Sequence, residues 1–565
     1  MIFWGVPLRW FILVGGVLAP LLTLGASLTP GIGPDVGLRG GWTKSTELGF
    51  SNSRPDAAPI LPPTLGNPDP PHLADAQKVL LLSVTFEGNH VFSDEQLLAV
   101  IGSDLGRAVT AEELQAIRHR LTKFYVDHGY INSGTWIPDQ EITNGKVHFQ
   151  VVEGQVCGIQ VSGNRRLHNS FIEQGLLPEP TEVLNMQQLQ DRVLLLHQDP
   201  LIERIKVEVI PGLRRGEATL AAEVTEATLW HWQIETNNYR PPDVGSEQVI
   251  LTGGFANITG NADALQVSYA RSQGVNDTTI DYDFPLRGRN TALAFGGEYV
   301  DARAISPDFK DLDITGKSRR FHVGLYHFLV RSPDAENKLG VKLEWAENKT
   351  SLLDDPFSFF AGEANGKSSV AVIRLEQEWL SRSLEQVLAA RSTFSLGIDA
   401  LGSTINSSAP DSRFFSWMGE LQWARRFGEN RRYQQITRAL ARFSDESLLL
   451  LERFSMAGPN MVRGYREGLL IHDNGWLLSL ELRAPLGDGE HGGQTLQIAP
   501  FIDLGQTWDK TEKHESLASA GIGLRWQPNE RLQANIYFGV PFGQVDHPTT
   551  TLQDHGVLFQ ASYQF

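Results

Sequence analysis

The sequence predicts an all-β transmembrane barrel of about 16 antiparallel strands, preceded by two small α+β modules. From residue 227 to the C-terminus, short segments alternate apolar and polar residues, which is the pattern of strands with one face in lipid. Residues 79–226 contain an internal repeat. Outside the N-terminus no apolar run is long enough for a membrane-spanning helix, and a chain without such helices crosses a bilayer as a closed barrel.

Length, charge and cysteine content bound the class of protein. A chain of 565 residues is long enough for about two to four units. The net charge of −17 excludes a nucleic-acid partner, because such partners require clustered Lys and Arg. Cys157 is the only cysteine, which excludes an internal disulfide framework and a cysteine-rich zinc site.

Residue patterns that carry catalysis are missing from the sequence. No nucleotide-binding glycine loop follows a predicted strand. His119 and His128 lack the spacing and the neighbouring carboxylate of a metal site. Asp281 and Asp283 alternate on one strand face, where we expect them to be solvated in a lumen rather than to bind calcium. We therefore expect no enzyme, no metal and no cofactor.

The N-terminus has the order of a secretory signal peptide. Arg9 precedes an apolar run from Trp10 to Leu24, and small residues follow it, so a signal peptide is predicted over residues 1–27. The alternative is an uncleaved anchor helix. Residues 28–77 are dense in proline and glycine, which predicts an extended linker without a core.

The repeat divides residues 78–226 into two modules of about 75 residues each, 78–153 and 154–226. In both modules an alternating strand ends in Gly-Asn, amphipathic helices follow, and two more strands complete a β-α-α-β-β order. The alternative is a pair of generic, unrelated α+β modules. The repeated positions are Gly88 and Gly163, Asn89 and Asn164, Leu114 and Leu189, and Leu121 and Leu196.

Residues 227–565 form the predicted barrel. Leu478, Leu480 and Leu482, for example, interleave with polar residues of the same segment. At about 21 residues per strand and connection, this region accommodates about 16 strands. A soluble β-sandwich also alternates, but this length would make it very large. The last segment ends on aromatic residues, among them Tyr563 and Phe565.

Two motifs about 40 residues apart provide a candidate site. Arg463 lies in Val462-Arg463-Gly464-Tyr465, a segment rich in glycine and proline that predicts a loop. Asp503 lies in Phe501-Ile-Asp503-Leu-Gly505, a predicted strand in which Asp503 faces away from the apolar side. A charge at the lipid-facing midplane costs about 2–4 kcal/mol, so both charges are expected inside the barrel.

Together these features resemble the two-partner secretion transporters of the outer membrane, of the haemolysin secretion/activation type (ShlB/FhaC/HecB) in the Omp85 superfamily. The resemblance covers residues 79–565, and it identifies the two modules as polypeptide-transport-associated (POTRA) domains. In that superfamily the arginine of the loop tetrad Val462, Arg463, Gly464 and Tyr465 pairs with the aspartate of the wall motif Phe501, Asp503 and Gly505. The resemblance therefore implies that Arg463 and Asp503 form a lumenal latch.

The resemblance also implies a function and a location. The POTRA domains would lie in the periplasm and capture an unfolded exoprotein, which then crosses the outer-membrane lipid through the barrel. The barrel-assembly machinery would recognise the terminal strand with Tyr563 and Phe565. Two alternatives stay open: an Omp85-type insertase that assembles other barrels, and a passive porin. The identity of the exported protein cannot be deduced.

An extended peptide can be captured by adding a strand to an exposed sheet edge beside a helix. In the first module a helix is predicted from Thr110 to His128, beginning with the capping-box spacing of Thr110 and Glu113. A strand is predicted from Tyr130 to Ile137. The expected substrate groove lies between this helix and this strand.

Overall fold

The computed structural model describes residues 78–178, 182–286, 290–487, 495–510, 514–543 and 551–565. They form two compact units, one over residues 78–228 with 260–262, and one over the rest of 229–565. The expected signal peptide, 1–27, and linker, 28–77, lie outside the described residues. Among the helices that are described, none is long and apolar enough to span a membrane.

The first module is built on a three-stranded sheet in the order β2-β5-β4, in which β2 runs parallel to β5 and β4 antiparallel to it. Two short strands, β1 and β3, pair with each other. The elements of this module are β1 (Val79–Leu80), β2 (Ser83–Glu87), α3 (Asp94–Ile101), β3 (Ala108–Val109), α4 (Ala111–Asp127), β4 (Gly134–Trp136) and β5 (Lys146–Val152).

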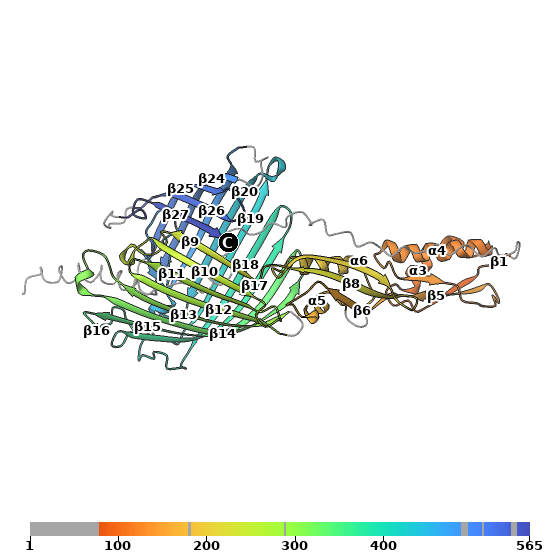
Figure 1. Ribbon diagram of the computed structural model, residues 1–565, viewed down its shortest axis with the longest axis horizontal. Coiled ribbons are helices and arrows are strands. Elements are labelled where there is room, and N and C mark those ends of the chain that lie inside the picture. Colours follow the sequence, from red (N-terminus) through yellow and green to blue (C-terminus); the bar gives the residue numbers. More distant parts are fainter. Residues whose placement is uncertain (1–77, 179–181, 287–289, 488–494, 511–513, 544–550) are drawn as a thin grey trace, which may run out of the picture. The chain divides into compact units, whose positions relative to one another are not determined.

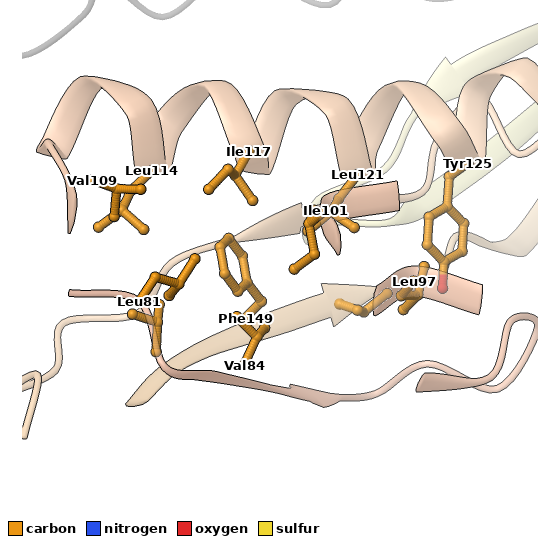
Figure 2. Packing of buried hydrophobic residues seen from close by; sticks show 12 residues of the cluster. Leu81, Val84, Leu97, Ile101, Val109, Leu114, Ile117, Leu121, Tyr125 and Phe149 are labelled. Carbon is orange, nitrogen blue, oxygen red and sulfur yellow. The ribbon is translucent and has the colours of Figure 1, made fainter. Parts of the chain in front are cut away.

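Local sequence explains both helices of this module. The side chains of Ser93 and Thr110 each accept a hydrogen bond from the backbone N–H three residues on. In return, the side chains of Gln96 and Glu113 accept a hydrogen bond from the backbone N–H of the cap residue. The apolar residues of α4 recur at helical spacing and point toward the sheet, as Figure 2 shows. The buried side chains labelled in this core are Leu81, Val84, Leu97, Ile101, Val109, Leu114, Ile117, Leu121, Tyr125 and Phe149.

The strand predicted from Tyr130 to Ile137 is wrong in length, because β4 spans only Gly134–Trp136. The preceding residues form a turn instead: Gly129 has a φ of +92°, and the Ser133 N–H donates to the Tyr130 carbonyl at 3.1 Å. The residues from Tyr130 to Ser133 therefore belong to a turn and not to the strand.

The second module repeats the order of the first, with a sheet in the order β6-β8-β7. β6 runs parallel to β8, as β2 does to β5. Cys157 lies on β6 at the sheet edge and is exposed. The elements are β6 (Gln155–Ser162), α5 (Asn169–Leu176), α6 (Met186–His197), β7 (Ile202–Pro211) and β8 (Glu217–Glu226).

Equivalent side chains support equivalent turns in the two modules. Asn89 and Asn164 donate from Nδ2 to a backbone carbonyl three residues on, at 3.0 and 2.8 Å. Glu153 Oε1 accepts two backbone N–H groups of the turn after β2, and Glu226 Oε1 accepts three of the turn after β6. Burial by itself would raise the pKa of Glu226, but the three N–H groups hold it below its ordinary value.

The second unit is a closed barrel, as the sequence predicted (Figure 1). Sixteen long antiparallel strands of the described residues form its wall, and β16 (Asp355–Pro356) extends one hairpin. The wall strands are β9 (Trp230–Asn237), β10 (Gln248–Ala256), β11 (Ala264–Ser272), β12 (Val275–Pro285), β13 (Thr291–Arg303), β14 (Thr315–Arg331), β15 (Ala335–Leu352), β17 (Lys367–Arg382), β18 (Gln386–Ile398), β19 (Phe415–Phe427), β20 (Tyr433–Ser444), β23 (Asn474–Pro485), β24 (Thr495–Trp508), β25 (Glu515–Gln527), β26 (Leu532–Pro541) and β27 (Val557–Gln564).

The last strand closes the barrel against the first one. Residues of β27 from Gln560 to Gln564 pair antiparallel with β9 from Asn237 to Gln233. Phe565 follows β27, and its ring lies 5.0 Å from that of Tyr563 in an edge-on contact. Closure removes the free strand edges that a bilayer cannot solvate.

Candidate functional site

The site lies on the connection between β20 and β23, residues 445–473, here called the lumenal loop. It contains the short helix η6 (Leu450–Glu452) and the two-stranded pair of β21 (Phe454–Ser455) and β22 (Ile471–His472). Pro459, Asn460 and Arg463 line a cavity of about 900 Å³ together with residues of the surrounding barrel strands. The loop therefore folds into the barrel instead of extending outward from the barrel rim.

Arg463 is bound to two strands of the wall. Its Nε donates to Asp503 Oδ2 at 2.8 Å and its Nη2 to Asp503 Oδ1 at 2.9 Å, which is a bidentate pair. The Arg463 backbone N–H also donates to Asp503 Oδ2, at 3.1 Å. The Nη1 atom donates to Glu481 Oε2 at 2.5 Å, and Nη2 contacts Ser479 Oγ at 3.3 Å. One guanidinium thus joins the loop to β23 and β24.

The surroundings of Arg463 strengthen this pairing. Arg463 is 4% exposed and Asp503 is fully buried, so water screens the two charges little. The guanidinium carbon lies 3.7 Å from the ring centroid of Phe501, a cation–π arrangement on the same strand as Asp503. Phe501 and Asp503 of the wall motif thus both contact the guanidinium of Arg463.

Glycine at two positions lets the loop and the wall approach each other. Gly464 has a φ of +91°, and a Cβ there would lie 2.9 Å from the backbone of Gly539 on β26. A Cβ on Gly505 would lie 3.0 Å from Val462 and 2.7 Å from Met456. Larger residues at either position would push the loop away from the strands.

Tyr465 completes the loop motif with a contact to a fourth wall strand. Its hydroxyl donates to the carbonyl of Ala518 on β25 at 3.0 Å, and its ring is buried. The motif residues Val462 to Tyr465 therefore contact the wall from β23 to β26.

Sequence reasoning missed Glu481, the second carboxylate bound to Arg463. The alternation of β23 places Glu481 on the same polar face as Ser479, so the pattern contained a signal for a lumenal position. That pattern does not reveal which lumenal residue meets the loop, because the meeting depends on the path of a connection of nearly 30 residues.

A second ionic contact, of reversed polarity, was also missed. Glu452 of the lumenal loop is buried and accepts a hydrogen bond from Arg374 on β17 at 2.8 Å. Its other oxygen lies 3.7 Å from Arg442 on β20. Arg374 is held in turn by Glu344 on β15 at 3.0 Å. The loop carries an anion to this side of the wall and a cation to the other.

The end of the loop is tied to the rim of the barrel. His472 lies 3.3 Å from Asp509 and 3.3 Å from Glu515, one carboxylate at each ring nitrogen. Burial by itself would lower the pKa of His472, but the two carboxylates raise it above its ordinary value. Through these two contacts His472 joins the loop to the ends of β24 and β25.

The groove predicted beside α4 is filled at its middle. The Thr135 N–H of β4 donates to the hydroxyl of Thr122 on α4 at 3.1 Å, and the Thr135 hydroxyl donates to the Arg118 carbonyl at 3.0 Å. Gly134 lies so close to Thr122 that a Cβ would be 3.0 Å from its methyl group. In the described part of this module, the opposite edge, on β2, pairs with no further strand.

The candidate metal positions do not come together. Over the ranges that the structure describes, no three His, Cys, Asp or Glu side chains are arranged to hold a metal ion. Asp281 and Asp283 line the barrel cavity on β12.

Comparison with known proteins gives two family matches. Residues 216–526 match the family model of the haemolysin secretion/activation protein ShlB/FhaC/HecB, which is more than half of the chain. Residues 79–154 match the ShlB-type POTRA domain. The first module is therefore a POTRA domain, followed by a barrel of the secretion type.

Curated relatives and a solved structure agree with these matches. The chain is 24% identical to the outer membrane transporter CdiB of Escherichia coli over 431 residues, which is 72% of this chain and 69% of CdiB. It is 22% identical to the hemolysin transporter protein ShlB of Serratia marcescens over 481 residues, which is 82% and 83% of the two chains. The structure of CdiB from Escherichia coli shares the fold, with a TM-score of 0.68 at 19% identity over 91% of this chain and 94% of CdiB. The chain therefore belongs to the haemolysin secretion/activation protein ShlB/FhaC/HecB family, and it is an outer-membrane transporter of two-partner secretion with an N-terminal, periplasmic POTRA domain.

Proposed function

We propose that this transporter captures an unfolded exoprotein in the periplasm and passes it through a barrel whose lumenal loop is held by Arg463. The observation that carries the proposal is the buried bidentate pair of Arg463 with Asp503, which fixes a loop inside the conduit. A loop in that position must move or make room when a polypeptide passes. The pair is thus a latch with a conformational role, and no enzymatic activity is needed.

The chain is thereby divided into five segments. A signal peptide (1–27) and a linker (28–77) precede two POTRA domains (78–153 and 154–226) and the barrel (227–565). Asn89 and Asn164 make the same turn contact, each in its own module, and so do Glu153 and Glu226. This equivalence supports a second POTRA domain. The exoprotein is the substrate partner. Outer-membrane lipid surrounds the barrel, and the barrel-assembly machinery engages the terminal strand with Tyr563 and Phe565.

Co-expression tests the proposed function. A candidate exoprotein encoded beside the transporter gene is expected to appear in the medium only when the transporter is present. Periplasmic retention of that exoprotein without the transporter provides the control. Release of the exoprotein to the same extent without the transporter would contradict the proposal. Folding of the exoprotein outside the cell supplies the driving force, since no nucleotide is available in the periplasm.

The open edge of β2 is the better receiving edge for an extended segment. The β4 edge is blocked, because Thr122 already accepts the central amide of β4. Two large apolar side chains lie beside β2, Leu80 at 49% exposure and Leu82 at 58%. Backbone bonds from β2 would provide affinity, and these leucines would bury apolar residues of the substrate.

Replacing Leu82 by aspartate is expected to weaken capture of the unfolded exoprotein by about tenfold or more. Burial of a leucine contributes about 1.5–3 kcal/mol, and each 1.4 kcal/mol is about tenfold in affinity. Binding of fluorescently labelled, unfolded exoprotein to the full-length transporter in detergent measures the effect. The matched control is Leu213→Asp, because Leu213 is fully exposed in the turn before β8. Equal affinities for the two variants would exclude β2 as the receiving edge.

A further inference from the structure

Three lysines lie side by side on the outer face of the barrel. Lys317 of β14 is the register partner of Lys349 on β15, and Lys349 is the register partner of Lys367 on β17. These strands are neighbours in the wall (Figure 1). All three lysines are exposed, with side-chain exposures of 52% for Lys349 and 50% for Lys367. We call these three residues the cationic row.

The cationic row faces outward because it continues the apolar face of its strands. On β14, Lys317 is followed at every second position by Arg319, Phe321, Val323 and Leu325, all exposed. The intervening Ser318 and Arg320 are buried on the lumenal face. The outer wall therefore changes from cationic to apolar along one strand.

Like charges at directly opposed positions destabilise a sheet, because neighbouring strands are only about 4.8 Å apart. Two carboxylates offset part of this repulsion. Glu347 lies 3.0 Å from Lys349 and 2.7 Å from Lys367, and Asp301 is the register partner of Lys317. Arg319, whose guanidinium lies 5.8 Å from the ring centroid of Tyr299, adds a fourth cation. Four cations against two carboxylates leave an excess of positive charge in a chain of net charge −17.

The row lies at the level of the outer-leaflet headgroups. The chain enters the barrel at β9 directly after its periplasmic part, so β14, five strands later, begins at the extracellular end. Just below the row, the rings of Phe321 and Trp345 stack with centroids 6.0 Å apart and an interplanar angle of 15°. Aromatic residues on the outer face mark the interface of a transmembrane barrel with its bilayer. Cations immediately outside that interface meet the lipid headgroups.

We propose that the cationic row binds phosphate groups of a phosphorylated glycolipid in the outer leaflet. Each ammonium group can approach a phosphate as a compact point charge, and three in register would neutralise several phosphate charges together. The fatty-acid chains of the same lipid would pack on the apolar outer face that contains Val323 and Leu325. The glycolipid thus relieves the repulsion that the lysine register imposes.

Binding of purified lipopolysaccharide to the full-length transporter in detergent tests this proposal. The triple variant K317Q/K349Q/K367Q is expected to bind at least about tenfold more weakly, since each cation near anionic lipid contributes to affinity. The matched control K123Q/K206Q/R214Q removes the same charge from exposed positions in the periplasmic unit and is expected to bind as the wild type does. Heat-modifiable gel mobility verifies that each barrel is folded, and Lys349→Gln alone replaces the triple variant if that variant does not assemble.

Two further arms identify the ligand. Enzymatically dephosphorylated lipopolysaccharide is expected to bind the wild type as weakly as the intact lipid binds the triple variant. Millimolar inorganic phosphate is expected not to compete, and competition by phosphate would overturn the lipid assignment. Equal affinity of the wild type and the triple variant, or of the intact and dephosphorylated lipid, would overturn the proposal. None of these outcomes bears on export, which the secretion assay measures separately.

Discussion

Replacing Arg463 by alanine is expected to leave the barrel assembled and to reduce export of the exoprotein at least about tenfold. The substitution leaves Asp503, which is fully buried, and Glu481 without the cation they share. Removing one partner of a buried ion pair costs about 3–5 kcal/mol. The lumenal loop would then leave its position, while the strand pairing that closes the barrel is untouched. Secreted exoprotein in the medium and heat-modifiable mobility of the transporter measure the two effects.

Several variants separate the latch from a general loss of charge. Asp503→Ala is expected to match Arg463→Ala, and Arg463→Lys to export less than the wild type because lysine cannot form the bidentate pair. The control is Arg413→Ala, which removes a half-exposed arginine from an aspartate pair in another loop. Wild-type export by both Arg463→Ala and Asp503→Ala would refute the latch.

Deletion of residues 79–153 is expected to abolish export while the barrel still assembles. This segment holds a self-contained core around Phe149 and Leu121, so its removal takes away one folded module and the open β2 edge. A transporter without a capture surface has nothing to hold the unfolded chain near the pore. Exoprotein accumulation in the periplasm, measured against the medium, is the readout.

The matched control leaves the module folded and changes only its exposed charge. Lys123→Ala with Asp127→Ala removes an exposed ion pair on α4 and is expected to export normally, since such pairs contribute little. Export that survives the deletion would show that capture does not depend on this module.

The barrel and the repeated modules could be predicted from sequence because both leave local signals. A strand with one face in lipid alternates with a period of two, and this pattern is visible within a single segment such as Leu478 to Arg483. The helix capped by Thr110 was predictable for the same reason, since its cap and its apolar face are both visible in one short segment of sequence. The extent of the strand after Tyr130 was not, because residues 130–133 form a hydrogen-bonded turn before β4 begins.

Contacts between distant segments required the tertiary structure. Glycine content and alternation are local properties, and they sufficed to predict that Arg463 lies in a loop and Asp503 on a polar strand face. The structure was needed to show that Glu481 also binds Arg463 and that Glu452 binds Arg374. It was needed as well to place Lys317, Lys349 and Lys367 in one row. Loop paths and strand registers bring together residues that are separated by turns of variable length, and no local pattern encodes that alignment.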